Sequence, residues 1–228
     1  MGLPVVVLIS GAGSNLQALI DRQLAGDLPV EIRDVISNRA DALGLERAKR
    51  AGIATRVLSH REFMTRAAYD AELVTLSDGF APGLVVLAGF MRILTPEFVA
   101  KFQGRLLNIH PSLLPKFPGL HTHQRAIEAG ETVHGATVHF VTEELDGGPG
   151  VIQARVPVLP GDDATALAAR VLAQEHLIYP LAVGWFAKDR LRLGEDGLAR
   201  LDGEVLHRPI RLDELSLAGN QTLTEDKV

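Results

Sequence analysis

The hydrophobic residues of the first half of the chain form short continuous runs that alternate with longer amphipathic stretches. Residues 5–9 and 84–88 are uninterrupted apolar runs of strand length, which is typical of strands buried on both faces of a sheet. Between these runs, apolar positions recur every three or four residues, as on one face of a helix. The alternation predicts βαβ units and a parallel sheet with both faces covered. The predicted strands are 5–9, 31–36, 54–58 and 84–88, and the predicted helices are 14–24, 42–51 and 61–78.

The second half of the chain has a different pattern. A strand at 106–109 leads into a loop rich in proline and glycine, and strands at 132–141 and 150–158 flank a Gly-Gly-Pro turn. A long amphipathic helix at 163–187 contains Pro180, where we expect a kink or a break. The two halves together predict an α/β fold with a mostly parallel central sheet, helices on both faces and an antiparallel extension toward the C-terminus.

The pattern weakens after residue 190. A hairpin is predicted at 191–206, and the tail from about Pro209 has so little apolar periodicity that we expect it to be disordered. The chain contains no internal repeat, low-complexity tract or linker. We therefore expect a single domain over residues 1–205, followed by a C-terminal tail, 206–228, to which the pattern gives no role.

The amino-acid composition excludes several kinds of active site and binding partner. The chain has 228 residues and no cysteine, which excludes a thiolate nucleophile, a disulfide scaffold, an iron–sulfur cluster and cysteine-based zinc sites. A formal charge of −5 argues against a partner such as nucleic acid or a membrane surface. No basic leader precedes the first apolar run, and no run approaches the ~20 residues of a membrane span. These features predict a soluble, cytoplasmic protein.

The first candidate site is the loop at 11–15, Gly-Ala-Gly-Ser-Asn, between the first strand and the first helix. Free N–H groups at a helix start attract an anion, and the side chains of Ser14 and Asn15 add donors. Leu16 stands where a dinucleotide-binding fingerprint has its third glycine, and no Lys-Ser/Thr pair follows as in a P-loop. The loop therefore fits the phosphate of a mononucleotide better than a pyrophosphate, although an ordinary tight turn has the same pattern.

The second candidate is the end of the strand at 106–109. Strand alternation places Asn108 and His110 on the same side, at the carboxyl edge where parallel sheets bind ligands. Pro111 ends the strand and leaves the His110 imidazole free at that edge. An amide donor beside an imidazole can stabilise an oxyanion and move a proton. A lone histidine is more often a satisfied core residue, so this pair alone leaves both interpretations open.

Other candidates are less specific. Asp146 lies on a glycine-rich loop where a carboxylate can orient an imidazole and favour its protonated form, although Asp is also a common turn residue. His121 and His123 have no carboxylate at ligand spacing, so we expect a loop of hydrogen-bonded imidazoles that supports the site, and no metal. Residues 89–94 follow a buried strand and are expected to line a pocket for a flat heterocycle or to belong to the core.

Taken together, these segments resemble the phosphoribosylglycinamide formyltransferase family of folate-dependent enzymes. They follow the family's order and spacing over residues 5–190. The Asn-x-His-Pro-Ser-Leu-Leu-Pro run at 108–115 marks the wider formyltransferase superfamily, whereas the Pro-Gly-Leu-His-Thr-His run at 118–123 points to this family. The other matching segments are 9–16 (Ile-Ser-Gly-Ala-Gly-Ser-Asn-Leu), 87–92 (Leu-Ala-Gly-Phe-Met-Arg), 146–149 (Asp-Gly-Gly-Pro) and 174–176 (Gln-Glu-His).

The resemblance implies a Rossmann-like formyltransferase fold and transfer of a formyl group from 10-formyltetrahydrofolate to the amine of phosphoribosylglycinamide in purine synthesis. It matches His110 with the proton donor, Asp146 with the residue that favours its protonated form, and Asn108 with the residue that contacts the formyl group. It implies small-molecule substrates, a monomer or homodimer, and no metal. The positions matched to the ribonucleotide are Gly13, Ser14, Asn15 and Glu175, and those matched to the folate are Arg66, Met91, Arg92, Ile93, Leu94 and Asn108.

Two positions depart from the family pattern. Ala12 stands where many members have Asn or Gly, which is tolerable if only the backbone contacts the ligand there. Gly150 follows Gly-Gly-Pro where an apolar residue is usual, so we expect a looser loop. Neither departure touches the three residues matched to catalysis.

Four alternatives stay open at this stage. A methionyl-tRNA formyltransferase would need a nucleic-acid-binding domain, but only 38 residues follow Arg190. A formyltetrahydrofolate deformylase would need an N-terminal regulatory domain, and here the first strand begins at Pro4 or Val5. A dinucleotide-binding dehydrogenase is disfavoured by the missing third glycine. A non-catalytic nucleotide-binding module would leave Asn108, His110 and Asp146 without a purpose.

Overall fold

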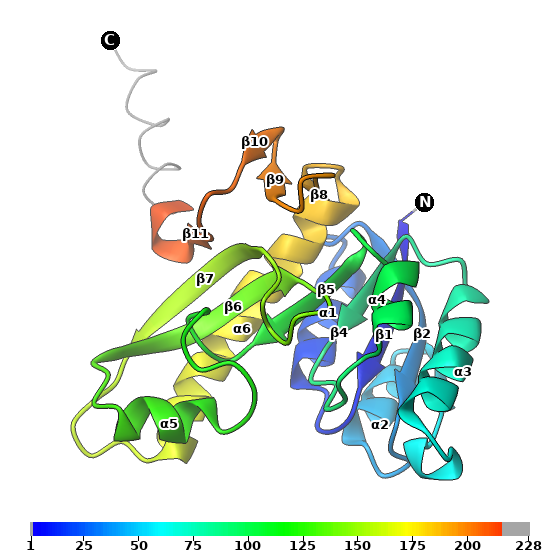
Figure 1. Cartoon of the computed structure of the whole chain (residues 1–228), viewed down its shortest axis with the longest axis horizontal. Coiled ribbons are helices and arrows are strands. Elements are labelled where there is room, and N and C mark those ends of the chain that lie inside the picture. The colour runs from blue at the N-terminus through cyan, green and yellow to red at the C-terminus, as the bar shows by residue number, and fades with distance from the viewer. Residues whose placement is uncertain (1, 216–228) are drawn as a thin grey trace.

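The computed structural model describes residues 2–215. Its main sheet has eight strands in the order β11-β7-β6-β5-β4-β1-β2-β3 (Figure 1). Strands β3, β2, β1, β4 and β5 run parallel to one another, whereas β6 is antiparallel to both β5 and β7. The strands are β1 (Leu3–Ile9), β2 (Val30–Ser37), β3 (Ala54–Val57), β4 (Leu84–Leu87), β5 (Leu106–His110), β6 (Val133–Phe140), β7 (Gly150–Pro157) and β11 (Ile210–Arg211).

Helices cover both faces of this sheet. Alternation along β1 sends Val5 and Val7 into one core with α1, α2 and α6, and sends Val6 and Leu8 into a second core with α3 and α4. A small antiparallel sheet follows α6, and its strands are β8 (Leu191–Leu193), β9 (Ala199–Leu201) and β10 (Glu204–Val205). The predicted fold class is confirmed. The helices are α1 (Ser14–Leu24), α2 (Leu43–Arg50), α3 (Arg66–Asp78), α4 (Pro96–Lys101), α5 (Thr122–Glu128) and α6 (Ala164–Ala187).

The helix predicted at 61–78 is interrupted. A single 3-10 turn, η1 (His60–Glu62), precedes α3, and the Thr65 side chain accepts the Ala68 N–H at 3.1 Å to cap α3. Of the kink or break predicted at Pro180, the break is wrong, because α6 continues through the proline over 24 residues. Packing of α6 against α1, β6 and β7 holds the turns on either side of the proline in place.

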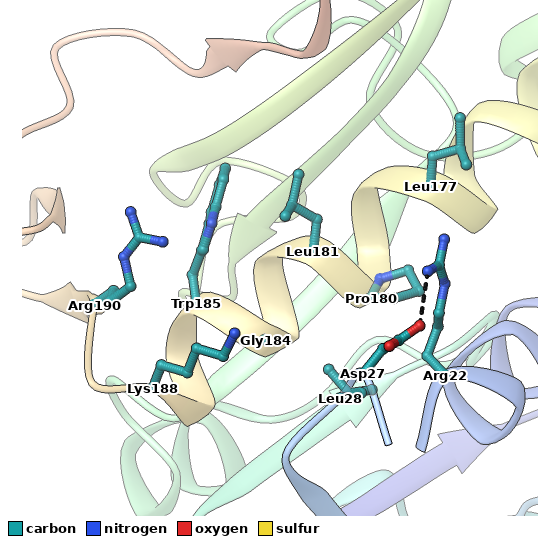
Figure 2. Close-up of a pocket in the computed structure, with 10 residues that line it drawn as sticks. All are labelled: Arg22, Asp27, Leu28, Leu177, Pro180, Leu181, Gly184, Trp185, Lys188 and Arg190. Atoms are coloured by element: carbon teal, nitrogen blue, oxygen red, sulfur yellow. Dashed lines mark hydrogen bonds and ion pairs between the residues drawn. The ribbon is translucent and has the colours of Figure 1, made fainter. Parts of the chain in front are cut away.

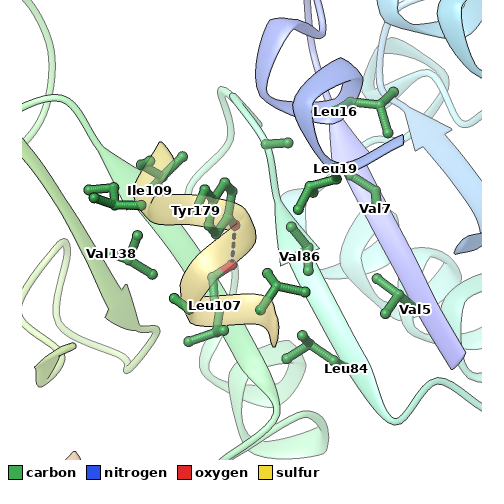
Figure 3. Packing of buried hydrophobic residues seen from close by; sticks show 14 of the residues in the cluster. Val5, Val7, Leu16, Leu19, Leu84, Val86, Leu107, Ile109, Val138 and Tyr179 are labelled. Atoms are coloured by element: carbon green, nitrogen blue, oxygen red, sulfur yellow. Dashed lines mark hydrogen bonds between the residues drawn. The ribbon is translucent and has the colours of Figure 1, made fainter. Parts of the chain in front are cut away.

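The hydroxyl of Tyr179 on α6 joins the two central strands. It lies 2.8 Å from the Leu87 carbonyl of β4 and 3.0 Å from the Leu107 carbonyl of β5 (Figure 3). Tyr179 is fully buried, so these carbonyls satisfy a hydroxyl that no water reaches. These contacts fix α6 against Leu87, the last residue of β4, and against Leu107 of β5, the residue before Asn108.

The chain returns to the main sheet after the small one. β11 pairs in parallel with β7, and Ile210 and Leu212 pack against the core. A Cβ on Gly150 would lie 2.5 Å from the Pro209 ring, so the returning segment fits closely only against a glycine. Order therefore extends beyond Pro209, where we expected disorder, and residues 216–228 of the expected tail lie outside the described residues. No helix in the described part of the chain is long and apolar enough to cross a membrane.

Candidate active site

The structure brings Asn108, His110 and Asp146 together at the carboxyl end of β5. The His110 ring is buried, with Nδ1 3.4 Å from an Asp146 carboxylate oxygen and Nε2 2.9 Å from the Phe117 carbonyl oxygen. Both ring nitrogens thus face acceptors, and only the doubly protonated ring has a donor for each. The geometry suits a general acid.

Asp146 also holds the loop that covers His110. One of its carboxylate oxygens accepts the Gly119 N–H at 2.8 Å, and its own backbone adopts a left-handed φ of 52°. A non-glycine residue in this region is uncommon and marks a tightly specified turn. The carboxylate therefore fixes the 111–121 loop and the imidazole at the same time.

Two hollows meet at this cluster. A smaller one, of about 100 Å³, and a larger one, of about 250 Å³, are both lined by Asn108 and Asp146. His110 lines only the larger hollow. The remaining predicted residues divide between them: Arg92, Ile93 and Leu94 line the smaller hollow, and Met91, His121 and His123 line the larger one. Arg66 lines neither and lies at the start of α3.

The phosphate-loop candidate lies where β1 passes into α1. Gly13 has a left-handed φ of 67°, and Ser14 and Asn15 form the first turn of α1. Both side chains are buried, and Asn15 donates a hydrogen bond to the Glu175 carboxylate. The distance between the donor nitrogen and the acceptor oxygen is 2.6 Å. Burial raises the pKa of Glu175, and the Asn15 hydrogen bond opposes this shift. The structure therefore joins three of the residues matched to the ribonucleotide with the fourth, which comes from α6.

Sequence reasoning missed three groups here. The Phe117 carbonyl faces His110, the buried His139 ring lies beside Asn108, and Arg47 reaches back from α2 to donate to the Ala12 carbonyl at 2.8 Å. Arg47 also lines a hollow with Ser14, which brings a positive charge next to the loop. The only sequence signal for any of these residues is the place of Arg47 in a predicted helix, and that does not indicate which loop it reaches.

His121 and His123 differ in environment. His121 directly precedes α5 with a left-handed φ of 57°, whereas His123 lies in α5 and burial lowers its pKa. The His123 ring meets His134 edge to face at 5.2 Å between centroids. Among residues 2–215, no group of three or more metal-ligating side chains is arranged to hold an ion.

A fourth hollow, of about 350 Å³, opens on the outer side of α6 (Figure 2). Trp185 and Pro180 line it, together with the Arg22–Asp27 ion pair from the end of α1. None of the residues predicted for the site lies there, so this hollow is separate from the catalytic cluster.

Comparison with known proteins identifies the family. The formyl transferase family model matches residues 3–183. The chain belongs to the formyl transferase family. Among its relatives, the phosphoribosylglycinamide formyltransferase of Escherichia coli (strain K12) is 58% identical over 202 residues, which is 89% of this chain and 95% of the relative. The enzyme of the same name from Haemophilus influenzae is 52% identical over the same shares.

Solved structures agree with these relatives. The phosphoribosylglycinamide formyltransferase of Coxiella burnetii, 50% identical, matches 92% of this chain and 99% of its own with a TM-score of 0.88. The glycinamide ribonucleotide transformylase 1 of Symbiobacterium toebii, 46% identical, matches 88% and 94% with a TM-score of 0.85. The resemblance read from the sequence is confirmed, and within the formyl transferase family this chain groups with the phosphoribosylglycinamide formyltransferases.

Proposed function

We propose that the protein transfers a formyl group from 10-formyltetrahydrofolate to the amine of 5-phosphoribosylglycinamide by direct attack, a step of purine synthesis. The observation that carries the mechanism is the pair of hollows with Asn108 and Asp146 in their common wall. A transfer between two substrates needs a donor site and an acceptor site that meet at the reacting carbon, and catalytic groups within reach of both.

The folate is assigned to the hollow lined by Arg92, Ile93 and Leu94. Apolar side chains beside a few polar groups suit a flat heterocycle. The other two positions matched to the folate, Met91 and Arg66, do not line this hollow. The ribonucleotide is assigned to the other side. Its phosphate takes the free N–H groups at Gly13, Ser14 and Asn15, with Arg47 nearby, and Glu175 holds the sugar end. The hollow on the outer side of α6, lined by Arg22 and Arg190, is not required for this reaction.

The residues around the formyl carbon then divide the chemistry. The substrate amine forms a bond to the formyl carbon, and the formyl oxygen becomes an oxyanion that Asn108 and the His110 imidazolium stabilise. Asp146, 3.4 Å from the ring nitrogen Nδ1, orients that imidazole. As the intermediate collapses, the bond from the formyl carbon to the folate nitrogen breaks, and that nitrogen takes a proton from the His110 imidazolium. The proton that the amine releases then restores the imidazolium. No acyl-enzyme forms, which agrees with a chain that has no cysteine.

The decisive experiment is a spectrophotometric assay of 10-formyltetrahydrofolate turnover with phosphoribosylglycinamide present and absent. We expect turnover only when the ribonucleotide is present, with one formylated product formed per folate released. Turnover without it would indicate a deformylase. Absence of turnover with both substrates would leave a nucleotide-binding module. Gel filtration during the same preparation distinguishes the monomer from the homodimer.

A further inference from the structure

A buried histidine outside the predicted catalytic set lies directly beside Asn108. His139 on β6 is the antiparallel partner of Asn108 on β5, and residues opposite each other in such a pair direct their side chains to the same face. His139 is 1% exposed and lines the smaller hollow. The two side chains meet, with His139 Nε2 3.2 Å from Asn108 Nδ2.

The surroundings of the ring determine which nitrogen carries the proton. Nδ1 lies 2.9 Å from the Phe140 carbonyl oxygen, which only accepts hydrogen bonds, so the proton is on Nδ1. Burial lowers the pKa of His139 to about 4, so the ring is neutral near pH 7. Nε2 therefore presents a lone pair, and Asn108 Nδ2 donates to it.

This hydrogen bond selects one of the two orientations of the Asn108 amide. The nitrogen and oxygen ends of a carboxamide have nearly the same shape, so packing alone does not distinguish them. Next to the His139 lone pair, only the nitrogen end is favourable. One N–H is then used by His139, and the second N–H and the carbonyl oxygen are left for the ligands of the two hollows.

The same lone pair affects Asp146. His139 Nε2 lies 3.9 Å from an Asp146 carboxylate oxygen, and an unprotonated nitrogen offers that oxygen no donor. His139 therefore does not compete for the Asp146 carboxylate, which contacts the His110 ring and accepts the Gly119 N–H. A proton on Nε2 would both reverse the Asn108 amide and compete for Asp146.

We propose that His139 is a positioning residue that fixes the orientation of the Asn108 amide, so that an N–H is aimed at the oxygen of the transferred formyl group. The aim at the formyl oxygen depends on the proposed function, but the tautomer of His139 and the orientation of Asn108 do not. Nothing in the proposed chemistry requires His139 to touch a substrate.

A double-mutant cycle tests this role. His139→Leu keeps a similar volume without a ring nitrogen, and we expect kcat to fall about 10- to 100-fold, as for a misplaced catalytic group, with little change in either KM. In an Asn108→Ala background the same substitution is expected to lower kcat less than about 2-fold, because the residue it acts through is absent. Equal losses in both backgrounds would overturn the proposal. In His139→Gln, whose side-chain oxygen can accept from Asn108, kcat is expected to recover in part.

His134→Leu is the matched control. It removes an equally buried imidazole from the same strand, one that has no contact with Asn108. We expect His134→Leu to lower stability as His139→Leu does, while its effect on kcat is the same with and without Asn108. A His134→Leu cost that also vanished in the Asn108→Ala background would overturn the assignment to His139.

A measurement on the unmodified protein keeps the proposal testable even if His139→Leu fails to fold. The ¹⁵N resonances of the His139 ring are expected to show a protonated Nδ1 and an unprotonated Nε2 coupled to the Asn108 side-chain N–H. A protonated Nε2 would overturn the proposal. Because this readout needs no substrate, it separates a failure of the positioning role from a failure of the proposed function.

Discussion

His110 lies between a charged acceptor and a neutral one, and this asymmetry matters for its role. The Asp146 carboxylate stabilises the protonated ring, whereas the Phe117 carbonyl at 2.9 Å is a weaker partner that a developing oxyanion on the substrate can replace. A hydrogen bond to an ionised acceptor is about twice as strong as a neutral one. In the proposed mechanism, the donor on Nε2 is kept oriented before the reaction and turns to the stronger acceptor when the oxyanion forms.

Removing either member of this pair tests the mechanism. In His110→Ala and in Asp146→Asn, we expect kcat to fall about 10²- to 10⁴-fold, the usual effect of losing a general acid. The ribonucleotide should still bind, because its phosphate contacts are elsewhere. Turnover by the folate assay and ribonucleotide binding by calorimetry check both statements. Near-normal turnover in either variant would contradict the assigned roles.

Ser14 tests the phosphate assignment. Ser14→Ala removes one hydroxyl donor from the first turn of α1 and leaves the backbone N–H groups in place. We expect a raised KM for the ribonucleotide, by about 10- to 100-fold for one hydrogen bond to a charged group, with little change in the KM for the folate. Steady-state kinetics with each substrate varied in turn provide the measurement. A raised folate KM instead would show that the loop serves the other substrate.

The sequence predicted the residues whose chemistry is local to one strand or loop. Asn108 and His110 were found by alternation along a strand that Pro111 ends. His139 was missed because its partner is set by the register between β5 and β6, and a gap of 22 residues separates these strands. No local sequence pattern specifies that register. A histidine inside an apolar run is interpreted as a buried core residue and not as part of a site.

At the scale of elements, α2 and the phosphate loop depend on a contact between two glycines. A Cβ on Gly13 would lie 2.5 Å from the Gly44 Cα, and a Cβ on Gly44 would lie 2.5 Å from the end of the Ile9 side chain and 3.2 Å from the Gly13 Cα. The Gly44 N–H donates to the Gly11 carbonyl at 3.0 Å. The start of α2 therefore packs directly on the loop and keeps Arg47 within reach of it.

Substituting Gly44 tests this contact. In Gly44→Ala the added methyl must push α2 away from the loop, so we expect a loss of about 1–3 kcal/mol of unfolding free energy, as for other overpacked sites, and a raised KM for the ribonucleotide. Gly11→Ala is the matched control for stability, since a Cβ there meets no atom within 4 Å. Denaturant unfolding of both variants is the measurement. Equal stability of the two variants would contradict the argument.

Helices with a long apolar pattern were predictable, and short helices were not. α4 and α5 have six and seven residues, which is under two turns and too short for a helical period to emerge. For α4 a signal existed, because Thr95 caps the helix and Pro96 occupies its first turn. The glycine at position 150, where the family usually has an apolar residue, could be explained only from the tertiary structure. Pro209, which fills the space beside Gly150, is 59 positions later in the chain.

At the scale of the whole molecule, buried histidines control the response to acid. Burial lowers the pKa of both His134 and His139 to about 4, below the ordinary 6.5 that applies when the chain is unfolded. Between these values the unfolded chain binds protons that the folded chain does not, so stability falls as the pH drops. Each ring adds to this loss, because each accepts a proton in the unfolded chain that it does not accept in the folded one.

We therefore expect the free energy of unfolding to decline from about pH 6.5 to pH 4 and to level off, for these two groups, below pH 4. Denaturant unfolding at a series of pH values measures the slope. His134→Leu should remove part of the slope, whereas His207→Leu, at an exposed position, should leave it unchanged. A slope that is the same in His134→Leu as in the unmodified protein would contradict this account.

The proposed single domain over residues 1–205 predicts one cooperative transition in these experiments.

The hydrogen bond from Asn15 to Glu175 spans 160 positions of the chain, and this has a consequence for synthesis. Asn15 leaves the ribosome near the start of translation, but its partner follows only when α6 is made. The proposed ribonucleotide site is therefore incomplete until α6 has been synthesised, even though strands β1 to β7 precede that helix in the chain. If Asn15 and Glu175 hold the ribonucleotide as proposed, a chain that ends before α6 does not bind this substrate.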